Sequence, residues 1–89
     1  IHTAAFYGHS AVVAVLVREG AIMEARDDEG ETPLHRAVVG NRLETVTLLA
    51  SLGANINTRN RYGVSALREA KLRDHDEIAA YLMEQGAFE

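Results

Sequence analysis

The segment Thr32–Ala37, with the sequence TPLHRA, decides the fold. Thr32 is a residue type that caps helix N-termini, and Pro33 suits the first helical position, where its missing N–H costs no hydrogen bond. The preceding residues Asp27–Gly30 are typical of a turn, in which Gly30 is free to adopt a positive φ angle. The pattern therefore predicts a turn followed by a short helix over residues 33–40.

A second helix is predicted directly downstream. Asn41 is the best residue other than glycine for a left-handed helix end. Aliphatic residues then recur at helical spacing over residues 43–51. Gly53 follows as a C-terminal cap. The unit is thus a turn, a short helix, a second turn and a longer helix.

The chain repeats itself at an offset of 33 residues, and so many agreements at one offset indicate an array of equivalent units. The strictest matches are Ala4, Ala37 and Ala70; Leu16, Leu49 and Leu82; and Gly20, Gly53 and Gly86. Neither helix of a unit reaches the roughly 12–15 residues that are marginal for an isolated helix in water. Stability must therefore come from stacking of neighbouring units.

The offset divides the chain into three units, over residues 1–25, 26–58 and 59–89. The first unit lacks its hairpin and the start of its first helix. Because the chain begins with Ile1 and not Met, we expect it to be part of a longer protein. The third unit reads SALREA over Ser65–Ala70, without the proline and the histidine. Its polar second helix predicts a C-terminal cap.

The chain resembles the ankyrin repeat family, because TPLHRA matches the family pattern T-P-L-H-x-A at the right period. The resemblance implies an all-α solenoid of stacked helix-turn-helix units joined by short β-hairpin loops. It also implies that the histidine of the motif bonds the hairpin backbone to the helix start. The residues that carry this structural motif are Gly30, Thr32, Pro33, Leu34, His35, Ala37, Gly53, Gly63 and Gly86.

The amino-acid composition limits the classes of partner that the chain is expected to bind. Apolar residues make up 47% of the chain and charged residues 25%, as in ordinary globular domains. The net charge of −4 does not favour a nucleic-acid partner. No apolar run approaches the roughly 20 residues of a membrane helix. We therefore expect a protein partner and no nucleic acid, membrane, cofactor or small-molecule substrate.

No catalytic or metal site is expected. His2 and His35 are equivalent residues of neighbouring units, and helices pack about 8–10 Å apart, too far for two ligands of one zinc ion. Ser10, Ser51 and Ser65 have no G-x-S-x-G setting. The sequence thus predicts a protein without enzymatic activity of its own.

The resemblance places a protein partner on the concave face, formed by hairpin tips and the exposed ends of the first helices. Several of these positions hold aromatic or aliphatic side chains, which typically mark interaction sites when exposed. Phe6 and Tyr7 have the alternative of packing against an upstream unit. The predicted partner-binding residues are Phe6, Tyr7, Asp28, Glu29, Glu31, Val39, Arg59, Arg61, Tyr62, Val64, Leu72 and Arg73.

Charge is segregated along the chain. Residues 24–31 hold five acids and one arginine, whereas residues 59–73 hold five basic residues and one glutamate. One hypothesis is that the resulting dipole orients a partner and raises its association rate. The alternative is that these are ordinary solvated charges of little energetic consequence.

Three functions stay open at this point. The first is a protein-binding module, and the second is the regulatory or substrate-recruiting segment of a larger enzyme or ubiquitin-ligase-type assembly. The third is a spacer whose surface binds nothing. The family resemblance implies an intracellular location, cytoplasmic or nuclear. It also suggests Asn57 as a hydroxylation substrate of an oxygen-sensing dioxygenase, with a structural hydrogen bond to the hairpin backbone as the favoured alternative.

Overall fold

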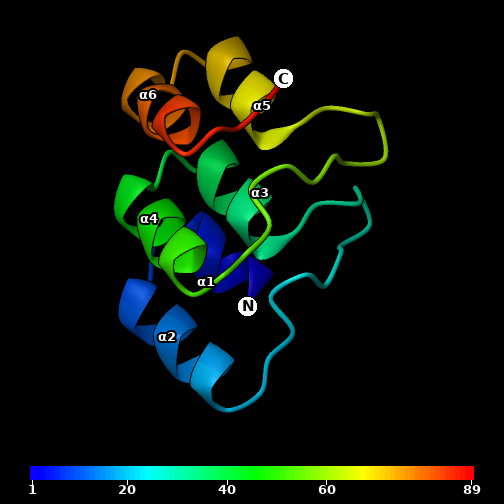
Figure 1. Cartoon of the computed structure of the whole chain (residues 1–89). Coiled ribbons are helices and arrows are strands. Elements are labelled where there is room, and N and C mark those ends of the chain that lie inside the picture. Colours follow the sequence, from blue (N-terminus) through cyan, green and yellow to red (C-terminus); the bar gives the residue numbers. More distant parts are fainter.

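The computed structural model describes all residues, 1–89, and contains six helices in three consecutive pairs. In Figure 1, α1, α3 and α5 form one layer, and α2, α4 and α6 form a second layer beside it. The long loops between pairs project from the side of the first layer. This arrangement confirms the predicted all-α stack of helix pairs. The helices are α1 (His2–Phe6), α2 (Ser10–Arg18), α3 (Pro33–Val39), α4 (Leu43–Ser51), α5 (Ala66–Leu72) and α6 (Asp76–Glu84).

The helix limits agree closely with the sequence pattern. The predicted helix over 33–40 ends at Val39, with Gly40 as its C-cap, and α4 spans the predicted residues. Thr32 Oγ1 accepts a hydrogen bond from the amide of His35 at 3.4 Å, as the capping prediction requires. None of the six helices combines the length and the apolar character needed to cross a bilayer.

Each short turn inside a helix pair contains one left-handed residue. The φ angles are +75° at Gly8, +60° at Asn41 and +57° at Asp74. These three residues are equivalent under the 33-residue offset, so the left-handed conformation belongs to the unit. Asn41 takes the conformation predicted for it, and Asp74 takes it without the advantage of glycine.

One continuous apolar core runs through all three units. Ala37 and Ala70 are fully buried, and small side chains at these positions let the first helices approach closely. The closest approach is at Gly40, where an added Cβ would lie 2.1 Å from the carbonyl oxygen of Phe6. The core therefore depends on small residues between α1 and α3 as much as on its leucines.

The long loops between units each contain a tight turn and no extended strand. A single antiparallel bridge joins Arg59 and Ser65. Asp27 Oδ1 accepts from the amides of Glu29 and Glu31 at 2.9 and 3.0 Å. The backbone also closes each turn, because the Asp27 amide donates to the Glu31 carbonyl and the Asn60 amide to the Val64 carbonyl, both at 3.0 Å. The predicted hairpins are therefore present as short turns without extended strands.

Neighbouring loops are tied to one another by repeated contacts. Arg26 donates to the carbonyl of Arg59, and the amide of Arg61 donates to the carbonyl of Glu29 at 2.9 Å. The Glu24 carboxylate accepts from the amide of Asn55 at 2.9 Å. The loops therefore hold fixed positions relative to one another, which is the property that a binding surface requires.

Candidate functional site

A groove of about 410 Å³ lies between the second and third units, on the side of the loops. Helices α3 and α5 and the two long loops all contribute to it. Six of the twelve predicted partner-binding residues line it. The lining consists of Glu29, Glu31, Arg36, Val39, Asn60, Tyr62, Val64, Glu69 and Arg73.

Tyr62 is the most accessible aromatic side chain of the groove, with 66% of its surface exposed. Asn60 Oδ1 accepts from the amides of Tyr62 and Val64 at 2.9 and 3.0 Å, so the loop that carries them is fixed. The guanidinium of Arg61 lies 5.4 Å from the Tyr62 ring centroid. A hydrogen bond to the nearby Glu29 carboxylate raises the pKa of Tyr62 above its ordinary value.

Arg36 forms one wall of the groove and was missed by the sequence analysis. It occupies the variable position of the TPLHRA motif, which carried no functional signal. Its guanidinium lies 4.8 Å from the Phe6 ring centroid, 3.5 Å from Glu31 Oε1 and 3.7 Å from Asp27 Oδ2. Arg36 therefore contacts both α1 and the loop before α3, and it does so at the wall of the groove.

Glu31 does not lie on the surface as predicted. Only 5% of the residue is exposed, and its Oε2 accepts from Asn60 Nδ2 at 3.1 Å. Its position near the hairpin suggested exposure, but the loop folds the side chain under the groove, where Asn60 and Arg36 satisfy the carboxylate. Glu31 belongs to the floor of the groove.

The histidine of the motif also differs from the expectation. His35 was expected to bond the hairpin backbone, yet both of its ring nitrogens are buried without a hydrogen-bond partner. Its equivalent, His2, does bond the backbone, with Nε2 at 2.8 Å from the Ala25 carbonyl and 3.0 Å from that of Glu31. The His35 ring lies next to the Glu31 carboxylate instead, with Nε2 3.5 Å from Oε2.

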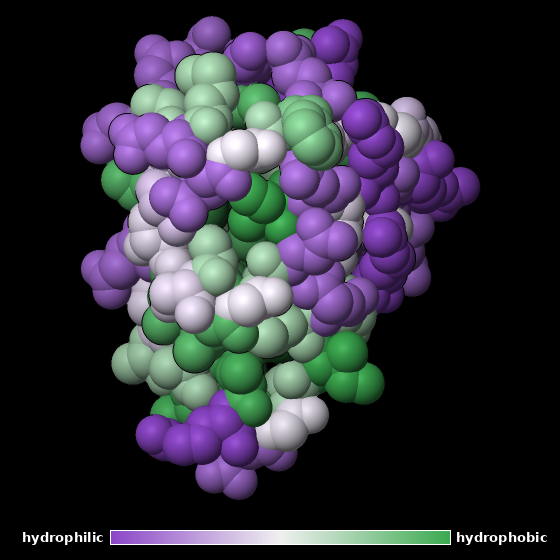
Figure 2. All heavy atoms as spheres, in the orientation of Figure 1, coloured by the Kyte–Doolittle hydropathy of each residue, from purple (hydrophilic) through white to green (hydrophobic).

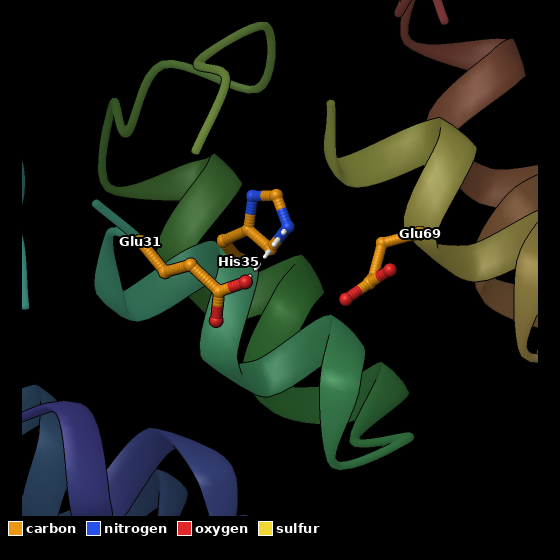
Figure 3. A group of neighbouring side chains, drawn as sticks. All are labelled: Glu31, His35 and Glu69. Carbon is orange, nitrogen blue, oxygen red and sulfur yellow. Dashed lines mark ion pairs between the residues drawn. The ribbon is translucent and has the colours of Figure 1, made fainter. Parts of the chain in front are cut away.

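Glu31, His35 and Glu69 form a cluster at the floor of the groove, in which Glu31 and His35 are buried and Glu69 is partly buried (Figure 3). One ligand atom of each residue lies within 4.8 Å of the others. Burial lowers the pKa of His35, and the carboxylates of Glu31 and Glu69 oppose that shift. This cluster was not predicted from the sequence, because Glu69 comes from another unit and lies 34 residues from His35 in the chain.

The other six predicted residues lie outside the groove lining. Tyr7 and Leu72 are more than half exposed. Phe6 is half-buried and meets Tyr7 edge to face at 4.9 Å between ring centroids. Arg59 uses its guanidinium within the chain, donating to the carbonyls of Gly63 and Glu89 at 3.1 and 2.7 Å.

Asp28 and Arg61 join the two loops. Both residues are exposed, and Arg61 Nη1 donates to the Asp28 carbonyl at 3.1 Å. The basic segment over 59–73 is less basic than its composition indicates, because Glu89 pairs with Lys71 at 2.9 Å and with Arg68 at 3.5 Å. Electrostatic steering of a partner stays a prediction.

Asn57 has a structural partner, although it differs from the predicted one. Its Oδ1 accepts from the amide of Phe88 at 3.0 Å, in the segment after α6. Under the 33-residue offset this bond is equivalent to the one between Glu24 and Asn55. The position therefore connects one unit to the next, and hydroxylation of Asn57 stays a prediction.

A second hollow of about 610 Å³ lies between α2 and α4. It is the trough between two outer helices, and small residues line most of it: Ser10, Ala11, Ala14, Glu44, Thr47, Leu48 and Ser51. Figure 2 shows apolar side chains gathered over α2, in the lower part of the view. Although it is larger, this hollow lacks the aromatic and arginine side chains that typically anchor a protein partner.

Comparison with known proteins identifies the repeats. A family model described as ankyrin repeats (3 copies) matches residues 1–88. The human Notch-regulated ankyrin repeat-containing protein is 42% identical over 60 residues, which cover 67% of this chain and 53% of that protein. The chain spans about half the length of such relatives.

Two further proteins, a long ion channel and a chain of a solved complex, contain segments similar to this chain. The human transient receptor potential cation channel subfamily A member 1 is 35% identical over 86 residues, covering 94% of this chain and 8% of the channel. A chain in the solved complex of the Bd0816 predatory endopeptidase from Bdellovibrio bacteriovorus with immunity protein Bd3460 superposes with a TM-score of 0.91. It is 35% identical, and the match covers 98% of this chain and 46% of that one.

Proposed function

The chain belongs to the ankyrin repeat family, a family of protein-interaction modules, and on that premise we propose that it binds a protein partner in the groove between its second and third units. In this proposal it catalyses no reaction. The partner contacts the exposed ring of Tyr62 and the aliphatic side chains of Val39 and Val64. The observation that carries the proposal is the exposure of Tyr62 on a loop fixed by hydrogen bonds.

The composition of the groove supports this assignment. Aromatic and arginine side chains dominate the energetics of protein interfaces, and the groove combines Tyr62 with Arg36 and Arg73. Arg73 Nε lies 3.4 Å from Glu69 Oε1, so this guanidinium is already oriented. A surface whose side chains are held before binding loses little conformational entropy when the partner docks.

The environments of the serines support a non-catalytic role. Ser10 shares a hydrogen bond with Thr45 at 2.7 Å, Ser51 donates to the carbonyl of Leu48, and Ser65 caps α5. None of these hydroxyls is hydrogen-bonded to a histidine, as a nucleophile activated by a general base would be.

Affinity capture followed by a binding titration tests the proposal. Partners captured with the 89-residue chain are titrated against the parent sequence, Tyr62→Ala and Met83→Ala. Met83 is a matched control, because it is also more than half exposed but lies on α6, away from the groove. Tyr62→Ala should weaken binding at least tenfold, about 1.4 kcal/mol, while Met83→Ala changes it less than twofold.

The opposite pattern, or equal losses in both variants, would contradict the groove as the contact site. Circular dichroism establishes that the three proteins have equal helicity. If no protein binds the folded parent chain specifically, the spacer function replaces this proposal.

A second candidate is the same binding role inside a larger enzyme or ubiquitin-ligase-type assembly. The match that covers 94% of this chain but only 8% of a channel supports only the part of this candidate that places such repeats within a longer protein. A catalytic domain on the same polypeptide, found by mass spectrometry of the native protein, would establish this candidate.

A further inference from the structure

We propose that Glu31, His35 and Glu69 form a binding site for a divalent transition-metal ion of the zinc class, beneath the groove. The three side chains come from the loop before α3, from α3 and from α5. Their ligand atoms lie within 4.8 Å of one another, and Figure 3 shows the two carboxylates on either side of the imidazole.

The unpartnered imidazole is the observation that points to a ligand. The side chain of His35 is only 1% exposed, and neither ring nitrogen has a hydrogen-bond partner. Buried polar atoms in proteins are almost always paired, because an unpaired one retains its full desolvation cost. A cation bound to Nε2 would supply the partner that this nitrogen lacks.

The ligand types select the class of ion. Imidazole nitrogen together with carboxylate oxygen suits zinc and its first-row neighbours, whereas calcium and magnesium prefer oxygen ligands alone. Three protein ligands are the number found when the fourth position holds water or an incoming group. Here that position faces the groove, because Glu31 and Glu69 both line it.

The surroundings of the carboxylates fit this role. Arg36 lies 3.5 Å from Glu31 Oε1, and Arg73 lies 3.4 Å from Glu69 Oε1. Both arginines engage the Oε1 atom, while Glu31 Oε2 accepts from Asn60 Nδ2 at 3.1 Å and lies 3.5 Å from His35 Nε2. Carboxylates that bind metals are commonly held in this way by outer hydrogen bonds.

The geometry requires a small closure on binding. Ligands about 2.0–2.2 Å from zinc lie closer together than 4.8 Å. Glu69 can move to meet the ion, because its side chain is 12% exposed and borders the groove. Binding should therefore draw α5 towards α3 and narrow the groove.

The test is a titration of the chelator-treated 89-residue chain with Zn²⁺ by calorimetry, and with Co²⁺ by visible absorption, at pH 7.5. We expect one ion per chain and at least a tenfold loss of affinity in Glu31→Gln and in Glu69→Gln. Two control variants, Glu77→Gln and His9→Gln, should bind within twofold of the parent. Glu77 and His9 are exposed and outside the cluster.

A second measurement needs no substitution, so it holds even if Glu31→Gln fails to fold. In the ¹⁵N spectrum of the imidazoles, Zn²⁺ should shift the His35 nitrogens and leave those of His2, His9 and His75 in place. Absence of binding at millimolar Zn²⁺, equal affinity of Glu69→Gln and the parent, or shifts at other histidines would overturn the proposal. The Tyr62→Ala titration tests protein binding separately, because Tyr62 is not one of the three metal ligands.

Discussion

The contact between the first two units and the contact between the last two use equivalent positions but satisfy their polar groups differently. Between the first two, His2 bonds two backbone carbonyls. Between the last two, the equivalent His35 has no hydrogen bond, and a charged groove lies above it. Arg42 donates to the Phe6 carbonyl at 3.1 Å, and its equivalent His75 bonds the Val38 carbonyl at 2.8 Å in the second contact, so this bond is common to both. In the first contact the motif histidine is paired, whereas in the second it is unpaired and lies beneath a groove lined by charged and aromatic side chains.

A binding site in a repeat array is expected where one contact between units departs from the pattern of the other. Unsatisfied buried groups and exposed aromatic side chains are exceptions to the rules that stabilise a fold, and such exceptions concentrate at functional sites. Gly40 brings α1 and α3 close together, so the first contact should be the more sensitive to added side-chain volume. The second should tolerate substitution of its unusual residues at little cost to folding.

The largest effect is expected at Gly40, in the first contact. Gly40→Ala places a Cβ 2.1 Å from the carbonyl oxygen of Phe6, and a backbone atom cannot move aside easily. We expect a loss of about 1–3 kcal/mol in the free energy of unfolding, measured by urea denaturation. The equivalent residue of the third unit is Arg73, where a side chain already fits.

Arg73→Ala is therefore the matched control, with an expected change of about 0.5 kcal/mol or less. Equal losses of unfolding free energy in Gly40→Ala and Arg73→Ala would show that the first contact is no more sensitive to these substitutions than the second.

Exchanging the two histidines for apolar residues should have unequal effects. His2→Ala leaves the carbonyls of Ala25 and Glu31 without their side-chain donor and should cost about 1–2 kcal/mol. His35→Met removes a buried group that has no partner and should cost less than about 1 kcal/mol or stabilise the fold. Thermal and urea unfolding with EDTA present measure both; a larger loss for His35→Met would refute the comparison.

The pH dependence of stability should separate the same residues. Because burial lowers the pKa of His35 below its ordinary value of 6.5, the folded state binds fewer protons than the unfolded state in this range. The contribution of His35 to the free energy of unfolding should be constant above pH 6.5. It should make the fold less stable as the pH decreases from there towards the lowered pKa. In urea melts with EDTA between pH 7.5 and 5, His35→Met should flatten this decline and His9→Gln should retain it.

The smallest effect is expected in a turn inside the third unit. Asp74 has a φ angle of +57° and no side-chain hydrogen bond or ion pair, so glycine there relieves backbone strain. Asp74→Gly should raise the free energy of unfolding by about 0.5 kcal/mol, after the greater flexibility of glycine in the unfolded chain is subtracted. A decrease measured by urea denaturation would argue against strain at this position.

The fold could be predicted almost completely from the sequence, because its signals are local. A capping threonine, Pro33 at the helix start and Asn41 at the first turn act within a few residues of where they stand. The 33-residue offset then placed the units relative to one another. The division at residues 25/26 and 58/59, and the capping role of the third unit, stay predictions.

The site could be predicted only in part, because it depends on contacts between units. Tyr62, Val64 and Val39 were identified from their positions in the repeat, and the structure brings them to one groove. The burial of Glu31 depends on Asn60, 29 residues away in the chain. The approach of Glu69 to His35 depends on how closely α5 packs against α3, which no local pattern encodes.

Hydrogen-exchange mapping of the chain with its captured protein partner tests the central claim most directly. If the partner binds in the groove, exchange of the amides around Val39, Tyr62 and Val64 should slow, while exchange in α2 and on the outer faces of α4 and α6 should not change. Protection confined to α2, α4 or α6, with unchanged exchange around Tyr62, would contradict that claim.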